Sequence, residues 1–419
     1  MTQIFTGIWA LLIGIVFIML GNGMHFTLIG LRGAIEGFSA SELAIVASGY
    51  FLGFLSGARL TPGMIKRVGH VRVFAALGSF MSAGLIAFPL LTDPILWTVL
   101  RVLVGFCMSG IYVTAESWLN ASATNETRGK VLSAYMIAQT LGIIGAQGLL
   151  TFGEAATAGL FIGASILVSI SFGPILLSVT PTPAADVTRP MPLRELFRGS
   201  PLGTVGIFLL GTIYATQSGM GAVYGTQVGM SANEISLFIA MLFGGALLLQ
   251  FPIGWLSDRM DRRKVILGCS VLGAAFCLLG WINGASVILL MGAAFLTGGV
   301  TTPLYALILA YTNDALATED MPAASGGLVL TFGIGAILGP LAAGAAMERF
   351  GPQTFWLVLG VTFVSIALYS AYRMTQRPAA PASETDSYLG VLPTASPVAV
   401  EAAGAWAMEQ GELERDAEA

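Results

Sequence analysis

Charged residues are scarce in this chain of 419 residues. Asp, Glu, Lys and Arg make up 10% of it, whereas hydrophobic residues make up 55%. A soluble globular domain usually carries about 25% charged residues, so this chain has too few charges to cover a water-soluble fold of its size. Its apolar residues come in blocks of about 20, the length at which a helix crosses a bilayer, rather than in the alternating segments of about 10 that a β-barrel needs. The sequence therefore predicts an all-α integral membrane protein.

Histidine and cysteine are also rare. The chain has two histidines and three cysteines, and Cys107, Cys269 and Cys277 all lie inside apolar blocks. Their spacing fits neither a metal site nor a disulfide, so small packing residues are the favoured interpretation. We expect no metal and no other cofactor. The sequence also lacks a His/Cys/carboxylate cluster, a nucleophile elbow and a phosphate-binding loop, which argues against an enzyme.

The apolar blocks number twelve, and one long polar stretch divides them into two sets of six. This stretch, "VTPTPAADVTRPMPLRELFRGS", is rich in proline and charge, and "LRELF" within it is expected to form a short helix on the membrane surface. The predicted organisation is a six-helix bundle at 1–178, a cytoplasmic linker at 179–200, a second six-helix bundle at 201–375 and a disordered acidic cytoplasmic tail at 376–419. A regulatory role for the tail is an open alternative to a merely solvated one.

Lysine and arginine gather on one side of this topology. They occupy the loops 59–72, 128–130 and 258–264, the linker and the tail. Only Arg32 and Arg349 lie on the other side, and Arg101 lies within a span. By the positive-inside rule, the basic side and both termini are cytoplasmic. We expect a multi-pass protein of the inner or plasma membrane.

The two sets of six blocks are related by an internal repeat. "GFSASEL" (37–43) recurs as "GMSANEI" (229–235), and each carries a Ser-x-x-Glu capping box before an apolar run. Gly105 and Tyr112 in the first half recur as Gly298 and Tyr305 in the second. Duplicated halves are typical of secondary transporters, in which the solute site lies near the midplane between the halves.

Several motifs resemble those of the major facilitator superfamily. "GWLSDRMDRRK" (254–264) is similar to the family's loop motif G-x-L-x-D-R-x-G-R-[RK], although Asp261 stands where the family has Gly. The matching loop of the first half has Lys66 in the position of the motif's Asp. "RVLVG" (101–105) resembles the motif R-x-x-x-G, which the family associates with proton-coupled exchange. "ESWLN" and "RGKVLSAYM" are similar to the poorly characterised YcaD-like subgroup. The resemblance implies two pseudo-symmetric six-helix bundles that rock against each other.

Polar residues inside the spans are the candidates for a solute cavity. The set is Asn22, His25, Arg101, Tyr112, Gln139, Tyr214, Gln217, Thr301 and Tyr305. Arg101 and Tyr112 share one helix face, and charges within a membrane usually mark functional sites. The groups suit a neutral or zwitterionic solute, with Arg101 able to hold one negative charge. Interhelical hydrogen bonding is the structural alternative for each residue, and His25 could titrate or only pack.

A second set of charged residues lies toward the cytoplasmic ends of the spans and is expected to control gating or coupling. It comprises Lys66, Arg67, Glu116, Arg128, Asp258 and Arg259. Glu116 lies about 22 Å along its helix from Arg101, so the two cannot pair. We interpret Glu116 as one partner of a gate salt bridge, with a proton carrier as the alternative. Asp258 is expected to cap a neighbouring helix.

These observations predict a secondary active transporter that moves a small polar solute by alternating access, coupled to protons. A drug or metabolite efflux antiporter and a passive facilitator remain alternatives, as does a non-transporting membrane sensor or scaffold. The expected partners are a small-molecule substrate, protons and the lipid bilayer, with no nucleic acid. We expect the protein to be a monomer.

Overall fold

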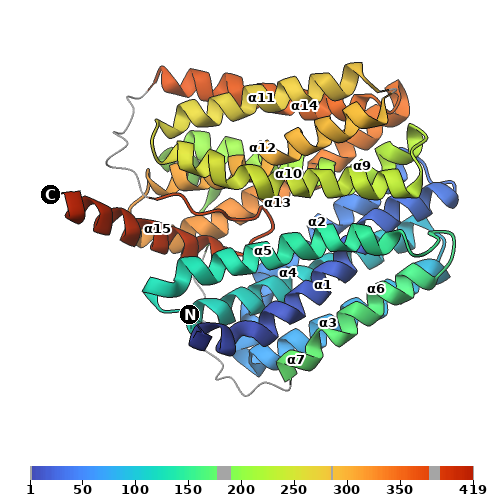
Figure 1. Cartoon of the computed structure of the whole chain (residues 1–419), viewed down its shortest axis with the longest axis horizontal. Coiled ribbons are helices and arrows are strands. Elements are labelled where there is room, and N and C mark those ends of the chain that lie inside the picture. Colours follow the sequence, from blue (N-terminus) through green and yellow to red (C-terminus); the bar gives the residue numbers. More distant parts are fainter. Residues whose placement is uncertain (1, 177–189, 285, 377–386, 419) are drawn as a thin grey trace.

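The computed structural model describes residues 2–176, 190–284, 286–376 and 387–418, and no strand occurs in these ranges (Figure 1). The first half contains α1 (Thr2–Ile35), α2 (Ala40–Val68), α3 (His70–Ala87), α4 (Pro94–Ser122), α5 (Asn125–Leu150), α6 (Gly159–Ile170) and α7 (Phe172–Leu176). The second half contains α9 (Pro201–Gln227), α10 (Ala232–Ser257), α11 (Arg262–Ile282), α12 (Val287–Asn313), α13 (Met321–Phe350) and α14 (Thr354–Met374). Short helices lie at α8 (Leu193–Gly199), η1 (Phe88–Leu90) and η2 (Thr318–Asp320), and α15 (Pro397–Glu418) ends the described chain.

The helices are long and apolar enough to account for the predicted spans. Within the described ranges, eleven helices could cross a membrane, and the number rises to 12 if the bent pair α8 and α9 is one span. The bend between these two helices is 120°. Helix α8 coincides with the short helix predicted at "LRELF". Residues 177–189, which include the first part of the linker predicted at 179–200, lie outside the described residues.

The two halves repeat the same helix packing. Helix α2 packs on α4 in the first half, as α10 packs on α12 in the second. The pairs α1–α5 and α3–α6 recur as α9–α13 and α11–α14. Both predicted capping boxes are present: Glu42 Oε2 accepts from Ser39 N at 2.8 Å, and Glu234 Oε2 accepts from Ser231 N at 2.8 Å. The pseudo-symmetric all-α membrane architecture is confirmed.

Glycine permits close helix contacts at equivalent positions of the two halves. A Cβ atom built on Gly105 of α4 would overlap the backbone carbonyl of Tyr50 in α2. A Cβ atom on Gly298 of α12 would overlap the carbonyl of Leu242 in α10. The repeat therefore conserves the spacing of these two helix pairs between the halves, because any side chain larger than hydrogen would force the helices apart.

The halves close against each other at one end of the bundle, which we call the distal end and which carries the loops before Ser39 and Ser231. Helix α2 packs on α13, and α5 packs on α10. Ser48 Oγ donates to the carbonyl of Ile337 at 2.8 Å, and Ser41 N donates to Glu348 Oε2 at 3.0 Å. The opposite end carries the loops at Gly69 and Asp261, and we call it the basic end.

The C-terminal segment lies between the halves at the basic end, beside α4, α5 and α13 (Figure 1). This differs from the prediction of a disordered tail over 376–419. Residues 387–418 are described and include the helix α15, while residues 377–386 lie outside the described residues. Val391, Ala399 and Val400 are buried. The prediction weighed proline, alanine and acidic residues, and it missed the apolar stretch "LGVLPTASPVAVEAAGAWAM".

Candidate functional site

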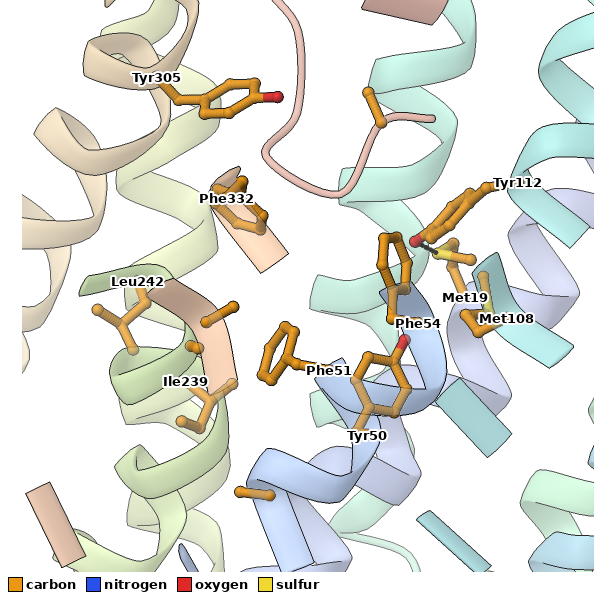
Figure 2. Close-up of a cluster of buried hydrophobic side chains, with 14 of the residues drawn as sticks. Met19, Tyr50, Phe51, Phe54, Met108, Tyr112, Ile239, Leu242, Tyr305 and Phe332 are labelled. Carbon is orange, nitrogen blue, oxygen red and sulfur yellow. Dashed lines mark hydrogen bonds between the residues drawn. The ribbon is translucent and has the colours of Figure 1, made fainter. Parts of the chain in front are cut away.

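A small cavity lies between the two halves, with about 30 Å³ in which the centre of a water molecule fits. The first half lines it with Asn22, Gly23, Phe26, Tyr50, Phe51, Tyr112, Ile143 and Gln147, and the second with Tyr214, Ser218, Ile239 and Phe243. Thr394 of the C-terminal segment completes the lining. Figure 2 shows the side chain of Phe51 of α2 directed toward Ile239 of α10. A smaller recess shares Tyr214, Ser218 and Phe243 with the cavity and adds Gln217, Leu242, Gly298 and Thr302.

Two amide side chains give this cavity polar atoms that could bind a solute. Asn22 Oδ1 and Gln217 Nε2 are buried and have no hydrogen-bond partner among the described residues. Gln147, by contrast, is held in place by the helices around it: its Oε1 accepts from Thr27 Oγ1 at 2.9 Å. A buried polar group without a partner costs about 1–3 kcal/mol, so a solute that pairs with Asn22 and Gln217 would recover this cost.

The predicted cavity residues fall into two groups. Asn22, Tyr112 and Tyr214 line the cavity, and Gln217 lines the smaller recess. The structure therefore brings together four predicted residues from both halves.

The remaining polar candidates lie elsewhere. Gln139 lies in a separate recess toward the basic end, together with Glu116 and Leu392. Thr301 Oγ1 donates to the carbonyl of Thr297 in its own helix at 2.8 Å. Tyr305 packs edge-on against Phe332, with ring centroids 5.5 Å apart. These three residues were cavity candidates, and they are not among the residues that line the cavity or the smaller recess.

Arg101 lies behind the cavity wall rather than in it. Its side chain is buried, and its Nη1 lies 3.1 Å from His25 Nδ1. The guanidinium carbon lies 4.3 Å from the ring centroid of Phe26 and 4.7 Å from that of Tyr50. Because both rings line the cavity, Arg101 supports the aromatic wall through cation–π contacts. Arg101 thus contacts one imidazole and two aromatic rings, and it is not among the residues that line the cavity.

His25 faces the interior of the first half. Its ring packs edge-on against Phe88 and Phe161, at centroid distances of 4.5 and 6.1 Å. The ring is fully buried among α1, α4, α6 and η1. His25 therefore positions Arg101 and does not line the cavity.

Glu116 is buried and hydrogen-bonded, but it is not part of a salt bridge among the described residues. Tyr135 OH donates to its Oε1 at 3.1 Å, and the backbone N–H of Ser396 donates to its Oε2 at 2.8 Å. Two of the cations expected near it, Arg59 and Arg67, are exposed toward the end of α2. In this conformation, the partner of Glu116 is the C-terminal segment rather than a basic residue.

The loop between α10 and α11 also differs from its expected role. Asp258 Oδ1 accepts from the backbone N–H of Tyr388 at 2.8 Å. The helix cap comes instead from Asp261, whose Oδ1 accepts from Arg263 N at 3.0 Å at the start of α11. Partial burial alone would raise the pKa of Asp261, but hydrogen bonds from Arg263 and its charge hold this pKa below the ordinary value. The Asp that departs from the family motif thus replaces a turn glycine with a charged cap.

The two remaining gating candidates are basic. The guanidinium carbon of Arg259 lies 4.3 Å from the ring centroid of Trp255, in its own helical turn. Arg128 is half-buried, and its Nε has no hydrogen-bond partner among the described residues. Neither residue contacts Glu116 through an ion pair in the described ranges.

Sequence reasoning missed the aromatic part of the site. Phe26, Tyr50, Phe51 and Phe243 line the cavity, but phenylalanine and tyrosine inside apolar blocks resemble ordinary packing residues. The position of Phe26 could have predicted its place in the cavity wall. It lies four residues after Asn22, and residues four apart share one face of a helix.

Two pseudo-symmetric helical halves around a central cavity define the architecture of a secondary transporter. The profile of the Major Facilitator Superfamily matches residues 11–232 and 203–400. The chain belongs to this family of membrane transporters, as its loop and span motifs predicted.

Two uncharacterised relatives agree with this assignment, and one solved structure shares the fold. An uncharacterized MFS-type transporter of Enterobacter sp. (strain 638) is 26% identical over 370 residues, which cover 85% of this chain and 94% of the relative. The uncharacterized MFS-type transporter YcaD of Escherichia coli O45:K1 (strain S88 / ExPEC) is 26% identical over 365 residues, with the same coverage. The crystal structure of nucleoside transporter NupG superposes with a TM-score of 0.76 at 15% identity, covering 88% of this chain and 99% of NupG. NupG thus shares the fold. These matches confirm the YcaD-like resemblance, and the proteins matched are transporters rather than enzymes.

Proposed function

We propose that this protein is a secondary active transporter that moves a small, neutral, polar solute by alternating access. The observation that carries the proposal is the central cavity, to which both halves contribute amide, hydroxyl and aromatic groups. The residues that line the cavity and the smaller recess include no charged side chain. A site of this kind orients a neutral solute by hydrogen bonds and ring stacking, because charged solutes need a charged partner once they leave water.

The expected solute has a flat or apolar face and several hydroxyl or amide groups. Phe26, Tyr50 and Tyr214 offer ring faces, whereas Asn22 and Gln217 offer one acceptor and one donor. Sugars and nucleosides have this combination. The name of NupG, a nucleoside transporter of the same fold, adds nucleosides to the compounds worth testing.

The conformation supports transport in which the halves meet at the distal end and are separated at the basic end by the C-terminal segment. The halves pack together at the distal end, and the cavity extends from there toward the basic end, where Thr394 of the C-terminal segment meets it. If the positive-inside rule holds, the basic end is cytoplasmic and the protein faces inward. Alternating access then requires the distal contacts to open while the basic end closes.

Uptake into proteoliposomes tests the proposed function. With an imposed pH gradient, we expect a neutral sugar or nucleoside to accumulate, while carboxylates and cationic drugs do not. Asn22→Leu and Gln217→Leu should each lower uptake about tenfold, because each removes one buried hydrogen bond worth about 1.4 kcal/mol. Gln376→Leu, at an exposed position after α14, serves as the control. Accumulation of charged compounds alone would refute the proposed solute class.

Glu116 is the proposed carrier of the coupled proton, because it is a buried carboxylate between the cavity and the basic end. We expect Glu116→Gln to abolish accumulation driven by a pH gradient, since an amide cannot bind and release the proton. Exchange of labelled for unlabelled solute should persist, because the cavity residues are unchanged. Glu154→Gln, in the exposed loop after α5, is the matched control. Undiminished gradient-driven accumulation by Glu116→Gln would remove Glu116 from the coupling mechanism.

A further inference from the structure

The C-terminal segment is seated on the second half of the bundle through Tyr388. Its backbone N–H donates to Asp258 Oδ1 at 2.8 Å, and its hydroxyl accepts from Gln250 Nε2 at 2.9 Å. The ring covers Gly254 of α10, where an added Cβ atom would collide with it. Burial raises the pKa of Tyr388 well above its ordinary value, so the phenol stays neutral in this seat.

The same segment is seated on the first half through Ser396 and α15. The backbone N–H of Ser396 donates to Glu116 Oε2 at 2.8 Å. The indole of Trp406 lies over Gly129 of α5, so that a Cβ atom at this glycine would lie 2.5 Å from the ring. The segment is thus bound to both halves at the end of the bundle that has to open and close.

Between its contacts through Tyr388 and through Ser396, the segment fills the entrance to the cavity. Figure 2 shows it as a bent coil that passes between Tyr305 and Tyr112. With Thr394 in the lining, about 30 Å³ of the cavity remains in which the centre of a water molecule fits. That volume accommodates about two water molecules, given that each needs about 10–15 Å³ by this measure. A sugar or nucleoside does not fit beside the segment.

We infer that residues 387–407 form an intramolecular plug, which closes the cavity from the basic end and holds the protein in the conformation that is closed at the distal end. The plug excludes solute from the cavity. It also acts as a wedge, because the basic ends of α4 and α10 cannot approach each other while Ser396 and Tyr388 lie between them. Each transport cycle therefore requires the plug to leave, and its release sets how much of the protein is active. The effect of the plug on transport rests on the proposed function. Its position at the cavity does not.

Matched glycine substitutions in the full-length chain can displace the plug. Gly129→Leu and Gly254→Leu place a side chain where the plug sits. Gly148→Leu and Gly244→Leu make the same change on the same two helices, where an added Cβ atom would meet nothing within 4 Å. The reporter is Leu309→Cys on α12, a buried residue beside the segment, in a chain whose native cysteines, all buried, are replaced by alanine.

The readout is the rate at which a membrane-impermeant maleimide labels this reporter in detergent micelles. We expect the plug-displacing pair to increase the rate at least about tenfold, in proportion to the fraction of molecules with the plug released. The control pair should label at the parent rate. Equal rates in the parent and the plug-displacing pair would overturn the inference.

A cross-link gives a second test that leaves the seats of the plug unaltered. A Cβ atom built on Gly404 of α15 lies 2.8 Å from Asn313 Nδ2 of α12. Oxidation of the full-length Gly404→Cys/Asn313→Cys protein should therefore form an intramolecular disulfide and stop uptake, and reduction should restore uptake. Failure to cross-link, or full uptake in the cross-linked state, would overturn the inference. If the labelling rates differ as expected but no variant transports any solute, the plug stands and the proposed function fails.

Discussion

Arg101→Ala is expected to abolish transport and to lower the free energy of unfolding by about 3–5 kcal/mol. The guanidinium of Arg101 lies over the rings of Phe26 and Tyr50 and contacts the imidazole of His25. Its removal would leave a void behind two side chains that line the cavity. The rings would relax into that void, so the site would lose its shape even though Arg101 itself does not touch the solute.

Two further variants show whether the packing of the Arg101 guanidinium or only its positive charge is required. Arg101→Lys keeps the charge, but a lysine ammonium cannot lie flat against two rings, so we expect intermediate transport and intermediate stability. Arg72→Ala, at an exposed position near the basic end, should change neither. Transport would be measured in proteoliposomes with the solute identified by the uptake panel, and stability by thermal unfolding in detergent. Normal transport by Arg101→Ala would show that the aromatic wall does not depend on this contact.

Gly105→Ala is expected to destabilise the protein by more than about 3 kcal/mol, at the upper end of what overpacking costs. The added Cβ atom would overlap the backbone carbonyl of Tyr50. A backbone carbonyl cannot swing aside as a flexible side chain can, so α2 and α4 would have to separate. The same argument applies to Gly298→Ala at the crossing of α10 and α12.

A glycine in an ordinary environment provides the control for this prediction. At Gly84 of α3, a Cβ atom would lie 3.5 Å from the nearest atom, Val104 Cγ2. Gly84→Ala should therefore be neutral or slightly stabilising, since alanine favours the helix over glycine by about 1 kcal/mol. Thermal unfolding of the two variants in the same detergent measures the difference. Equal unfolding temperatures for Gly84→Ala and Gly105→Ala would contradict the close crossing of α2 and α4.

The architecture was predictable from the sequence because the bilayer imposes simple rules on it. Apolar blocks of helical length define the spans, and the recurrence of Ser39 and Glu42 as Ser231 and Glu234 reveals the duplication. Asn22 and Tyr112 were found as cavity residues because polar groups avoid lipid and turn inward.

The site was only partly predictable, because helical periodicity gives the direction of a side chain but not what stands in front of it. Arg101 faces inward as predicted, yet Phe26 and Tyr50 lie between it and the cavity. The hydrogen-bond partner of Glu116 in the C-terminal segment could not be predicted for a different reason. Ser396 contacts it through a backbone N–H, a group that every residue except proline carries and that leaves no trace in the sequence.

The contact between the halves at the distal end has a consequence for the speed of the conformational change. Gly30 lies against Ala222, Gly219 against Ala47, and Gly344 against Ala44. Such small side chains do not interdigitate deeply. Few of them must therefore be withdrawn from between side chains of the other half before the two surfaces separate. Under the proposed alternating access, we therefore expect the distal contact to open with little steric resistance, so that the hydrogen bonds of Ser41 and Ser48 to the second half are the main interactions to break.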